Sequence, residues 1–271
     1  MKYTPRLPER NSNVSHEHPL REFLVLVTGT VALFAVIFIG MGLLVDIAVR
    51  YIDPELEATL FSSFESNDVL VLNEQEQALQ LLMDQLSSCM EIGYPVDIRI
   101  EASPHANAYA MPGGVVVVHS ALLEQIKTEN GLAFVLAHEL AHYQNRDHLR
   151  GMGRSVVLLA TSVVLTGAGS DVSSLLTPVF GAEIAQHSQS RESGADASAL
   201  GALQCHYGHV GGATEFFALI AETGAAADWY LAHYFASHPQ ALQRIDDVNQ
   251  TAISEGYQKG ELQDLPSALR L

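Results

Sequence analysis

Basic side chains are scarce in this chain: 14 lysines and arginines stand against 31 acidic residues, a formal net charge of −17. A protein this acidic lacks the positive patches by which proteins bind nucleic acid or dock on anionic lipid. We therefore expect no nucleic-acid partner. Cysteine is scarcer still, with only Cys89 and Cys205. In an oxidising compartment the two could form one disulfide, but each could equally be a buried thiol, so the sequence leaves their pairing open.

Charge of either sign is absent from residues 23–45. As a helix this run would be about 35 Å long, enough to cross a hydrocarbon core of about 30 Å. A cleaved signal peptide usually has an apolar region of only about 7–15 residues and a small-residue cleavage site. No clear site of that kind follows before Asp46. The run therefore predicts an uncleaved transmembrane signal anchor in contact with the lipid bilayer.

Positive charge is unevenly distributed around this run. Four basic residues lie within residues 1–22, whereas Arg50 is the only one that follows before Arg99. Because positively charged flanks stay in the cytoplasm, residues 1–22 are predicted to be a cytoplasmic tail. The rest of the chain then lies across the membrane, in the periplasm of a bacterium or in the intermembrane space of a mitochondrion.

The residues after the apolar run divide into a connector and one domain. Residues 46–72 are rich in acidic side chains and predict an exposed acidic linker. It leads into a helix near residues 73–88. Residues 73–265 are enough for a single domain with a full hydrophobic core.

The sequence H-E-L-A-H at residues 138–142 combines metal ligands with a general base. On a helix, His138 and His142 share one face and can both direct a ring nitrogen at one metal ion. Glu139 lies beside the first ligand, so its carboxylate can reach a water molecule at the metal. This arrangement is typical of zinc metallopeptidases.

A helix over about residues 131–146 is predicted to carry this motif, because strong helix formers precede it and Asn130 is a suitable N-cap. Two histidines on an otherwise apolar helix are costly to bury unless their nitrogens find partners. A metal ion is such a partner. We therefore expect one Zn²⁺ per chain.

A third zinc ligand is available downstream. Glu192 lies in a run over residues 182–203 that is predicted to be helical, and Asp196 follows four residues later on the same face. That spacing suits a glutamate ligand beside an aspartate that holds the second ring nitrogen of a ligand histidine.

The alternative third ligand is His148, six residues after His142, where a metzincin has its third histidine. The turn glycine of that motif is replaced here by Asn145. The metzincin methionine turn is also missing, since no methionine follows Met152. Glu192 is therefore favoured, and His148 is then expected at a solvated turn past the helix end.

Strand and turn signals precede the metal motif. Residues 96–101 alternate apolar and polar side chains, Pro112-Gly113-Gly114 indicates a turn, and residues 115–118 form a short apolar run before a helix over about 120–127. Residues 107–118 are either an ordinary hairpin or include an edge strand that pairs with an extended peptide. Beside a zinc site the second interpretation is favoured.

A second uncharged run covers residues 155–170. It is short for a membrane span, and a single crossing would place Glu192 on the opposite side of the membrane from His138. We expect residues 155–185 to form an apolar hairpin that packs against the domain or the membrane surface. A true two-pass hairpin is the alternative.

Four sequence blocks follow one another along the chain. They are Asn107-Ala108-Tyr109-Ala110 with Pro112-Gly113-Gly114, the H-E-x-x-H at 138–142, Arg191-Glu192 with Ala195-Asp196, and Ser237-His238-Pro239 with Arg244-Ile245. With these blocks in this order, over roughly residues 70–250, the chain resembles the HtpX and CAAX-prenyl-protease family of gluzincin metallopeptidases. One departure is Gly194, where relatives often have a second acidic residue.

The resemblance implies an α+β, mainly helical gluzincin-type domain with a small sheet that has an edge strand. It implies that Asn107, Ala108, Tyr109 and Ala110 form the substrate-binding strand. It also implies that His238 and Arg244 lie near the metal with catalytic roles.

The predicted function is that of a membrane-anchored zinc metalloendopeptidase in which Glu139 is the general base. The resemblance adds membrane or envelope protein quality control, with misfolded polypeptides as substrates. The alternative is a peptide-binding or chaperone-like protein whose zinc site is occluded by His238 or by residues 155–185. An intact Glu139 argues against this alternative.

Overall fold

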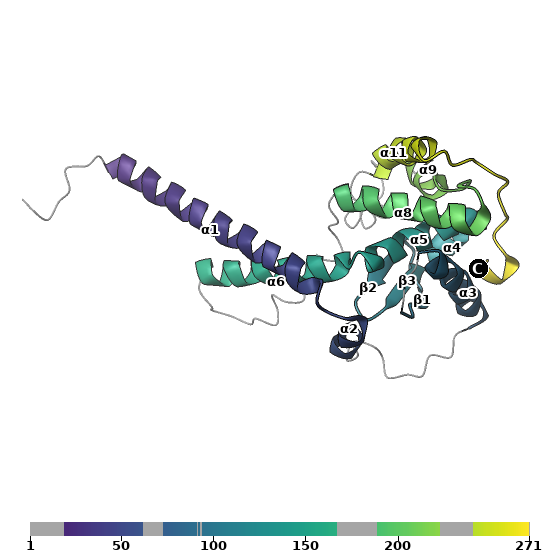
Figure 1. The fold of residues 1–271 in the computed structure, drawn as a ribbon, viewed down its shortest axis with the longest axis horizontal. Helices are drawn as coiled ribbons and strands as arrows, with labels where there is room; N and C mark the ends of the chain where they lie inside the picture. The colour runs from purple at the N-terminus through teal and green to yellow at the C-terminus, as the bar shows by residue number, and fades with distance from the viewer. Residues whose placement is uncertain are drawn as a thin grey trace, which may run out of the picture.

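The computed structural model describes residues 19–61, 73–90, 92, 94–166, 189–222 and 241–270. A long helix projects from a body in which helices surround a small sheet (Figure 1). This arrangement confirms the predicted mainly helical α+β class. The elements are α1 (Pro19–Val49), α2 (Pro54–Phe61), α3 (Glu74–Cys89), β1 (Asp97–Glu101), β2 (Ala108–Met111), β3 (Val115–His119), α4 (Ser120–Gln125), α5 (Glu129–Gln144), α6 (Asp147–Thr166), α8 (Gln189–Tyr207), α9 (Glu215–Glu222), α11 (Ala241–Ser254) and the 3₁₀ turn η2 (Ser267–Leu269).

The sheet has three described strands in the order β1-β3-β2. β1 is parallel to β3, and β2 pairs with β3 in antiparallel register with Ala110 opposite Val116. β2 and β3 therefore form a hairpin, and among the described strands β2 lies at an edge of the sheet. The predicted hairpin is therefore present, and its first strand is placed where an extended peptide could pair with it.

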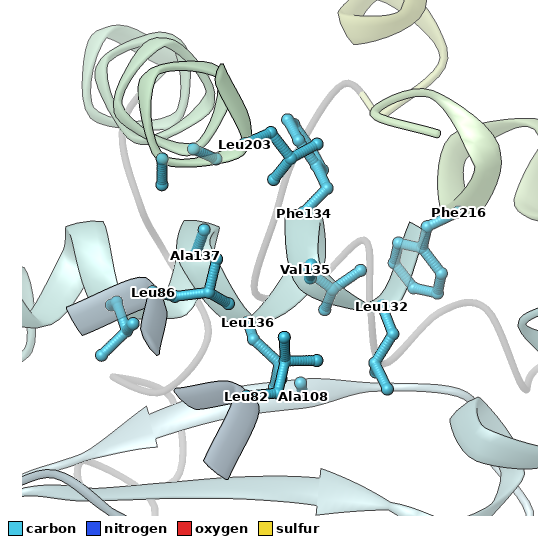
Figure 2. Close-up of a cluster of buried hydrophobic side chains, with 14 of the residues drawn as sticks. Leu82, Leu86, Ala108, Leu132, Phe134, Val135, Leu136, Ala137, Leu203 and Phe216 are labelled. Carbon is cyan, nitrogen blue, oxygen red and sulfur yellow. The ribbon is translucent and has the colours of Figure 1, made fainter. Parts of the chain in front are cut away.

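Helix α5 is the centre of the hydrophobic core. Every residue from Asn130 to Tyr143 is buried, as expected for a helix that has no polar face. Figure 2 shows Phe134 pointing towards Leu203 of α8, while Leu136 points towards Leu82 of α3. Helices on one side and the sheet on the other therefore enclose α5, and this fixes the position of the motif at its C-terminal half.

The start of α5 differs from the prediction. Thr128 is the N-cap, and its hydroxyl oxygen accepts a hydrogen bond from the backbone N–H of Gly131 at 3.0 Å. Asn130 is fully buried inside the helix, and its side-chain oxygen accepts from the backbone N–H of Gln263 at 2.7 Å. The expected cap is wrong because Asn130 is used for a tertiary contact.

Cys89 and Cys205 form a disulfide with a Cα–Cα distance of 5.9 Å. The bond joins the last residue of α3 to the C-terminal part of α8. The question that the sequence left open is therefore answered in favour of pairing.

The sequence predicts that the acidic connector, residues 46–72, is exposed, but part of it is buried. Residues 54–61 form the short helix α2, and Glu57 on this helix is only 2% exposed. The prediction of an exposed linker is wrong at Glu57, because the carboxylate forms a buried hydrogen bond with His148. Residues 62–72 lie outside the described residues.

Helix α1 contains the predicted span 23–45. Within the part of the chain that the structure describes, it is the one helix long and apolar enough to cross a membrane, and none of its most apolar window is buried. Length and composition therefore support a membrane anchor.

Helix α6 includes the first part of the second apolar run, up to Thr166, and the rest of that run lies outside the described residues. Its N-terminal half packs against the end of α1. A Cβ added at Gly153 would lie 2.4 Å from Cγ1 of Val45, so glycine permits this approach. Arg154 donates a hydrogen bond to Asp46 at 2.7 Å. Helix α6, which follows the H-E-x-x-H helix α5, is thus in direct contact with the C-terminal end of α1.

Candidate metal centre and active site

Three side chains from two helices converge at the C-terminal half of α5. His138 and His142 come from α5 and Glu192 comes from the first turn of α8. One ligand atom from each lies within 4.8 Å of the others, and all three residues are buried. The two Nε2 atoms are 3.0 Å apart, and oxygens of Glu192 lie 3.5 Å from Nε2 of His138 and 3.4 Å from Nε2 of His142. Two imidazoles with one carboxylate are a donor set of catalytic zinc sites, so these residues fit the expected ion.

Each of the two histidines also contacts an aspartate through its other ring nitrogen, Nδ1. Oδ1 of Asp196 lies 3.0 Å from Nδ1 of His138, and Oδ2 of Asp147 lies 3.0 Å from Nδ1 of His142. These contacts hold both rings with Nε2 directed at Glu192, which is the usual orientation of metal-binding histidines. Asp196 thus lies at the ring nitrogen of His138 that faces away from Glu192.

Sequence reasoning missed Asp147. It follows His142 by five residues, next to His148 for which the sequence predicts a solvated turn, but it is only 1% exposed. Burial lowers the pKa of His142, yet the hydrogen bonds with Asp147 and Glu192 outweigh burial and raise that pKa to about 9. The ring of His142 thus lies between the carboxylates of Asp147 and Glu192.

Arg244 of α11 lies inside this cluster and is 3% exposed. Its Nη1 donates to Glu192 at 2.7 Å and its Nε donates to Asp196 at 2.8 Å. Its Cζ lies 4.5 Å from the ring centre of Phe217. Burial raises the pKa of Asp196, but the hydrogen bonds from His138 and Arg244 outweigh it and hold that pKa below its usual value. Asp196 is therefore charged, and both carboxylates pair with Arg244.

Glu139 points towards the sheet rather than to solvent. It is 3% exposed, and its Oε2 accepts a hydrogen bond from the backbone N–H of Ala110 at 3.2 Å. This bond connects the candidate general base directly to the edge strand β2.

The register of β2 shows which main-chain groups face outward. The backbone N–H of His119 donates to the carbonyl oxygen of Asn107 at 2.9 Å, so Asn107 and Tyr109 direct their main-chain groups at β3. Because antiparallel pairs alternate, Ala108 and Ala110 direct theirs at the outer edge. The Tyr109 hydroxyl donates to Glu101 at 3.0 Å. Ala108, Tyr109 and Ala110 thus lie on β2 beside Glu139, and Asn107 directly precedes this strand.

Two predicted positions remain, His148 and His238. His148 is 8% exposed and its Nε2 lies 2.8 Å from Oε1 of Glu57, so the expectation of a solvated turn is wrong. Among the described residues, the group that could hold a metal ion contains Glu192 and not His148. His238 lies outside the described residues.

Two histidines of an H-E-x-x-H helix and a glutamate from a second helix define the zinc-peptidase class of site. The chain belongs to peptidase family M48, whose profile matches residues 73–252. This match confirms the resemblance derived from the four blocks, and with it the zinc-dependent class of the family.

Individual relatives are similar over shorter segments. Metalloprotease LoiP of Escherichia coli K12 is 28% identical over 171 residues, which cover 60% of this chain and 66% of LoiP. Mitochondrial metalloendopeptidase OMA1 of Schizosaccharomyces pombe is 38% identical over 77 residues, 26% of this chain and 23% of OMA1. The beta-barrel assembly-enhancing protease of Yersinia pestis is 41% identical over 58 residues, 21% of this chain and 12% of that protein. The chain thus spans less than two thirds of each relative's own length.

Proposed function

We propose that this chain is a membrane-anchored zinc metalloendopeptidase. The observation that carries the proposal is the convergence of His138, His142 and Glu192, whose ligand atoms lie within 4.8 Å of one another in a buried cluster. Asp196 and Asp147 would orient the two histidines through their Nδ1 atoms. Membership of family M48 supports the same conclusion.

A zinc ion held by His138, His142 and Glu192 would supply Lewis-acid chemistry, polarising a carbonyl and lowering the pKa of water at the site. Glu139 accepts a proton from the attacking water and then donates it to the leaving amine. Arg244 pairs with both Glu192 and Asp196, and its single positive charge partly offsets the negative charge beside the metal site. His238 is proposed to act near the metal on the strength of the resemblance alone.

The substrate is proposed to be an extended polypeptide that adds to the outer edge of β2. Ala108 and Ala110 direct their main-chain groups at that edge, and Ala110 already contacts Glu139. Main-chain pairing depends little on side-chain sequence, which suits unfolded or misfolded chains. One of the relatives is named a beta-barrel assembly-enhancing protease, and we propose a comparable role for this chain in membrane or envelope protein quality control.

We propose that the catalytic domain lies on the trans side of the membrane. The charge distribution around α1 supports this orientation, and so does the Cys89–Cys205 disulfide, because such bonds persist in oxidising compartments. Protease added outside spheroplasts should digest the domain without lysis. Protection of the domain until lysis would contradict this topology.

The direct test of the activity is casein hydrolysis by the full-length protein in detergent. We expect hydrolysis that a chelator abolishes and added zinc restores. Glu139→Gln should retain zinc and lose most of the activity, because the ligands stay and the base is removed. Equal activity in Glu139→Gln and the parent at matched zinc content would refute the mechanism.

A further inference from the structure

The short helix α2 follows the membrane anchor and contributes one buried carboxylate. α1 ends at Val49 and α2 begins at Pro54, so four residues connect them. Glu57 is 2% exposed, whereas Glu55 on the same helix is exposed. A buried carboxylate needs hydrogen-bond donors to offset the cost of losing water. Its donors therefore identify what α2 is docked against.

Three donors meet at Oε1 of Glu57. The backbone N–H of Gly113 and the hydroxyl of Tyr143 each donate at 3.2 Å, and Nε2 of His148 lies at 2.8 Å. Burial raises the pKa of Glu57, but the contacts with His148, Gly113 and Tyr143 outweigh it and leave that pKa below its usual value. Glu57 is therefore an ionised group at a junction of three segments.

Each donor belongs to a different part of the proposed active site. Gly113 is in the turn that follows β2. Tyr143 directly follows the candidate ligand His142 at the end of α5, and His148 directly follows Asp147 at the start of α6. The rings of Tyr143 and His148 stack with their centroids 4.7 Å apart. One carboxylate thus connects the edge hairpin to both helices at the metal cluster.

The hairpin is attached to these helices at two places. At the strand, the N–H of Ala110 donates to Glu139. At the turn, the N–H of Gly113 donates to Glu57, and a Cβ at Gly114 would lie 3.2 Å from the hydroxyl oxygen of Tyr143. The turn is also bonded to the sheet, since the backbone N–H of Asp97 donates to the carbonyl oxygen of Gly114 at 2.7 Å. Glu57 therefore adds, on the side of α2, a hydrogen bond to a turn that already pairs with β1.

The backbone before α2 is attached to the same corner. The guanidinium of Arg146, between α5 and α6, donates to the carbonyl oxygen of Ile52. Arg146 has a positive φ of 55°, a conformation uncommon outside glycine. The segment after the anchor is therefore docked on the active-site corner by a side chain as well as by Glu57.

We infer that Glu57 is a positioning residue, through which docking of the juxtamembrane helix α2 sets the place of the substrate-binding edge β2 over the zinc helix. The inference rests on the proposed function where it takes β2 as the substrate strand. It makes the first helix outside the membrane a part of the active site rather than a passive spacer. Substrate affinity then depends on the attachment of α2, while metal binding does not.

The test compares Glu57→Ala and Glu57→Gln with matched changes at Glu55, in the full-length protein in detergent. The measurements are KM and kcat on an extended peptide, zinc content, thermal midpoint, and amide hydrogen exchange of residues 108–114. We expect Glu57→Ala to raise KM about tenfold or more at parental zinc content and to accelerate exchange in 108–114. Glu57→Gln retains an acceptor oxygen and should recover part of the loss, and both Glu55 variants should match the parent.

Parental KM and parental exchange in Glu57→Ala would overturn the inference. A lower thermal midpoint with unchanged KM would also overturn it, because that pattern indicates a structural role only. If Glu57→Ala does not fold, the comparison of Glu57→Gln with Glu55→Gln decides by the same criteria. Amide hydrogen exchange in residues 108–114 can be measured without catalytic turnover. Failure of the proposed function therefore appears as a parent protein without peptidase activity. Failure of this inference appears as unchanged exchange in Glu57→Ala.

Discussion

Removing the disulfide should destabilise the domain by several kcal/mol. Cys89 and Cys205 are separated by 116 positions in the sequence, so their bond closes a long loop in the unfolded chain. Loop-closure entropy for that length corresponds to about 5 kcal/mol at 25 °C, which is an upper value because native disulfides typically contribute about 2–5 kcal/mol. The double variant Cys89→Ala and Cys205→Ala is the perturbation.

The assay is urea unfolding of the full-length protein in detergent, without reductant. For a urea dependence of about 2 kcal/mol per molar, the midpoint should fall by about 1–2.5 M. The parent treated with reductant should move in the same direction. Full alkylation of both cysteines in the native, unreduced parent would refute the reasoning, as would an unchanged midpoint in the double variant.

Asp147→Ala and Asp196→Ala should each lower zinc affinity or activity by roughly 10–100-fold, measured by metal titration, because each carboxylate orients one ligand histidine. Parental zinc affinity and activity in Asp147→Ala would show that the contact with His142 is incidental. The pKa of Glu57 is below its unfolded value, so its stabilisation is present above about pH 4.5 and is lost as the pH falls through the folded pKa. In Glu57→Gln, the unfolding free energy should therefore fall less steeply with acid below about pH 4.5, by up to about 1.4 kcal/mol per pH unit. Identical slopes in Glu57→Gln and the parent would contradict the assigned charge state.

Sequence spacing was enough to predict which candidate site residues share a face of the same helix. The four-residue spacing places His138 and His142 on one face of α5, and the same spacing places Glu192 and Asp196 on one face of α8. The turn signal after residue 111 predicted the hairpin, and the helix near residues 73–88 appears as α3 with Asn73 as its N-cap. These features depend on interactions within a few residues.

Features that depend on packing between distant segments were not predictable in this way. Asp147 reaches His142 because the chain turns at Arg146 with φ 55°, and nothing nearby in the sequence marks that reversal. Glu57 is buried beside His148, 91 positions away, whose Nε2 donates a hydrogen bond to the Glu57 carboxylate. From sequence alone, an acidic residue in an acidic segment is predicted to be exposed, because its buried partner is not visible in the local sequence.

Asn130 illustrates the same limit on a smaller scale. It is a good N-cap by residue type, as is Thr128 two positions earlier. The choice between them follows from the contact of Asn130 with the backbone of Gln263 near the C-terminus. Residue preferences therefore predicted that a helix begins here, and tertiary contacts determined at which residue.

Zinc content of two variants tests the central claim most directly. Glu192→Ala removes a proposed ligand from the buried cluster, whereas His148→Ala removes a buried histidine that pairs with Glu57 instead. Elemental analysis of the folded proteins after dialysis should show zinc lost from Glu192→Ala and retained, at about one ion per chain, in His148→Ala. Zinc retained in Glu192→Ala and lost from His148→Ala would contradict the account.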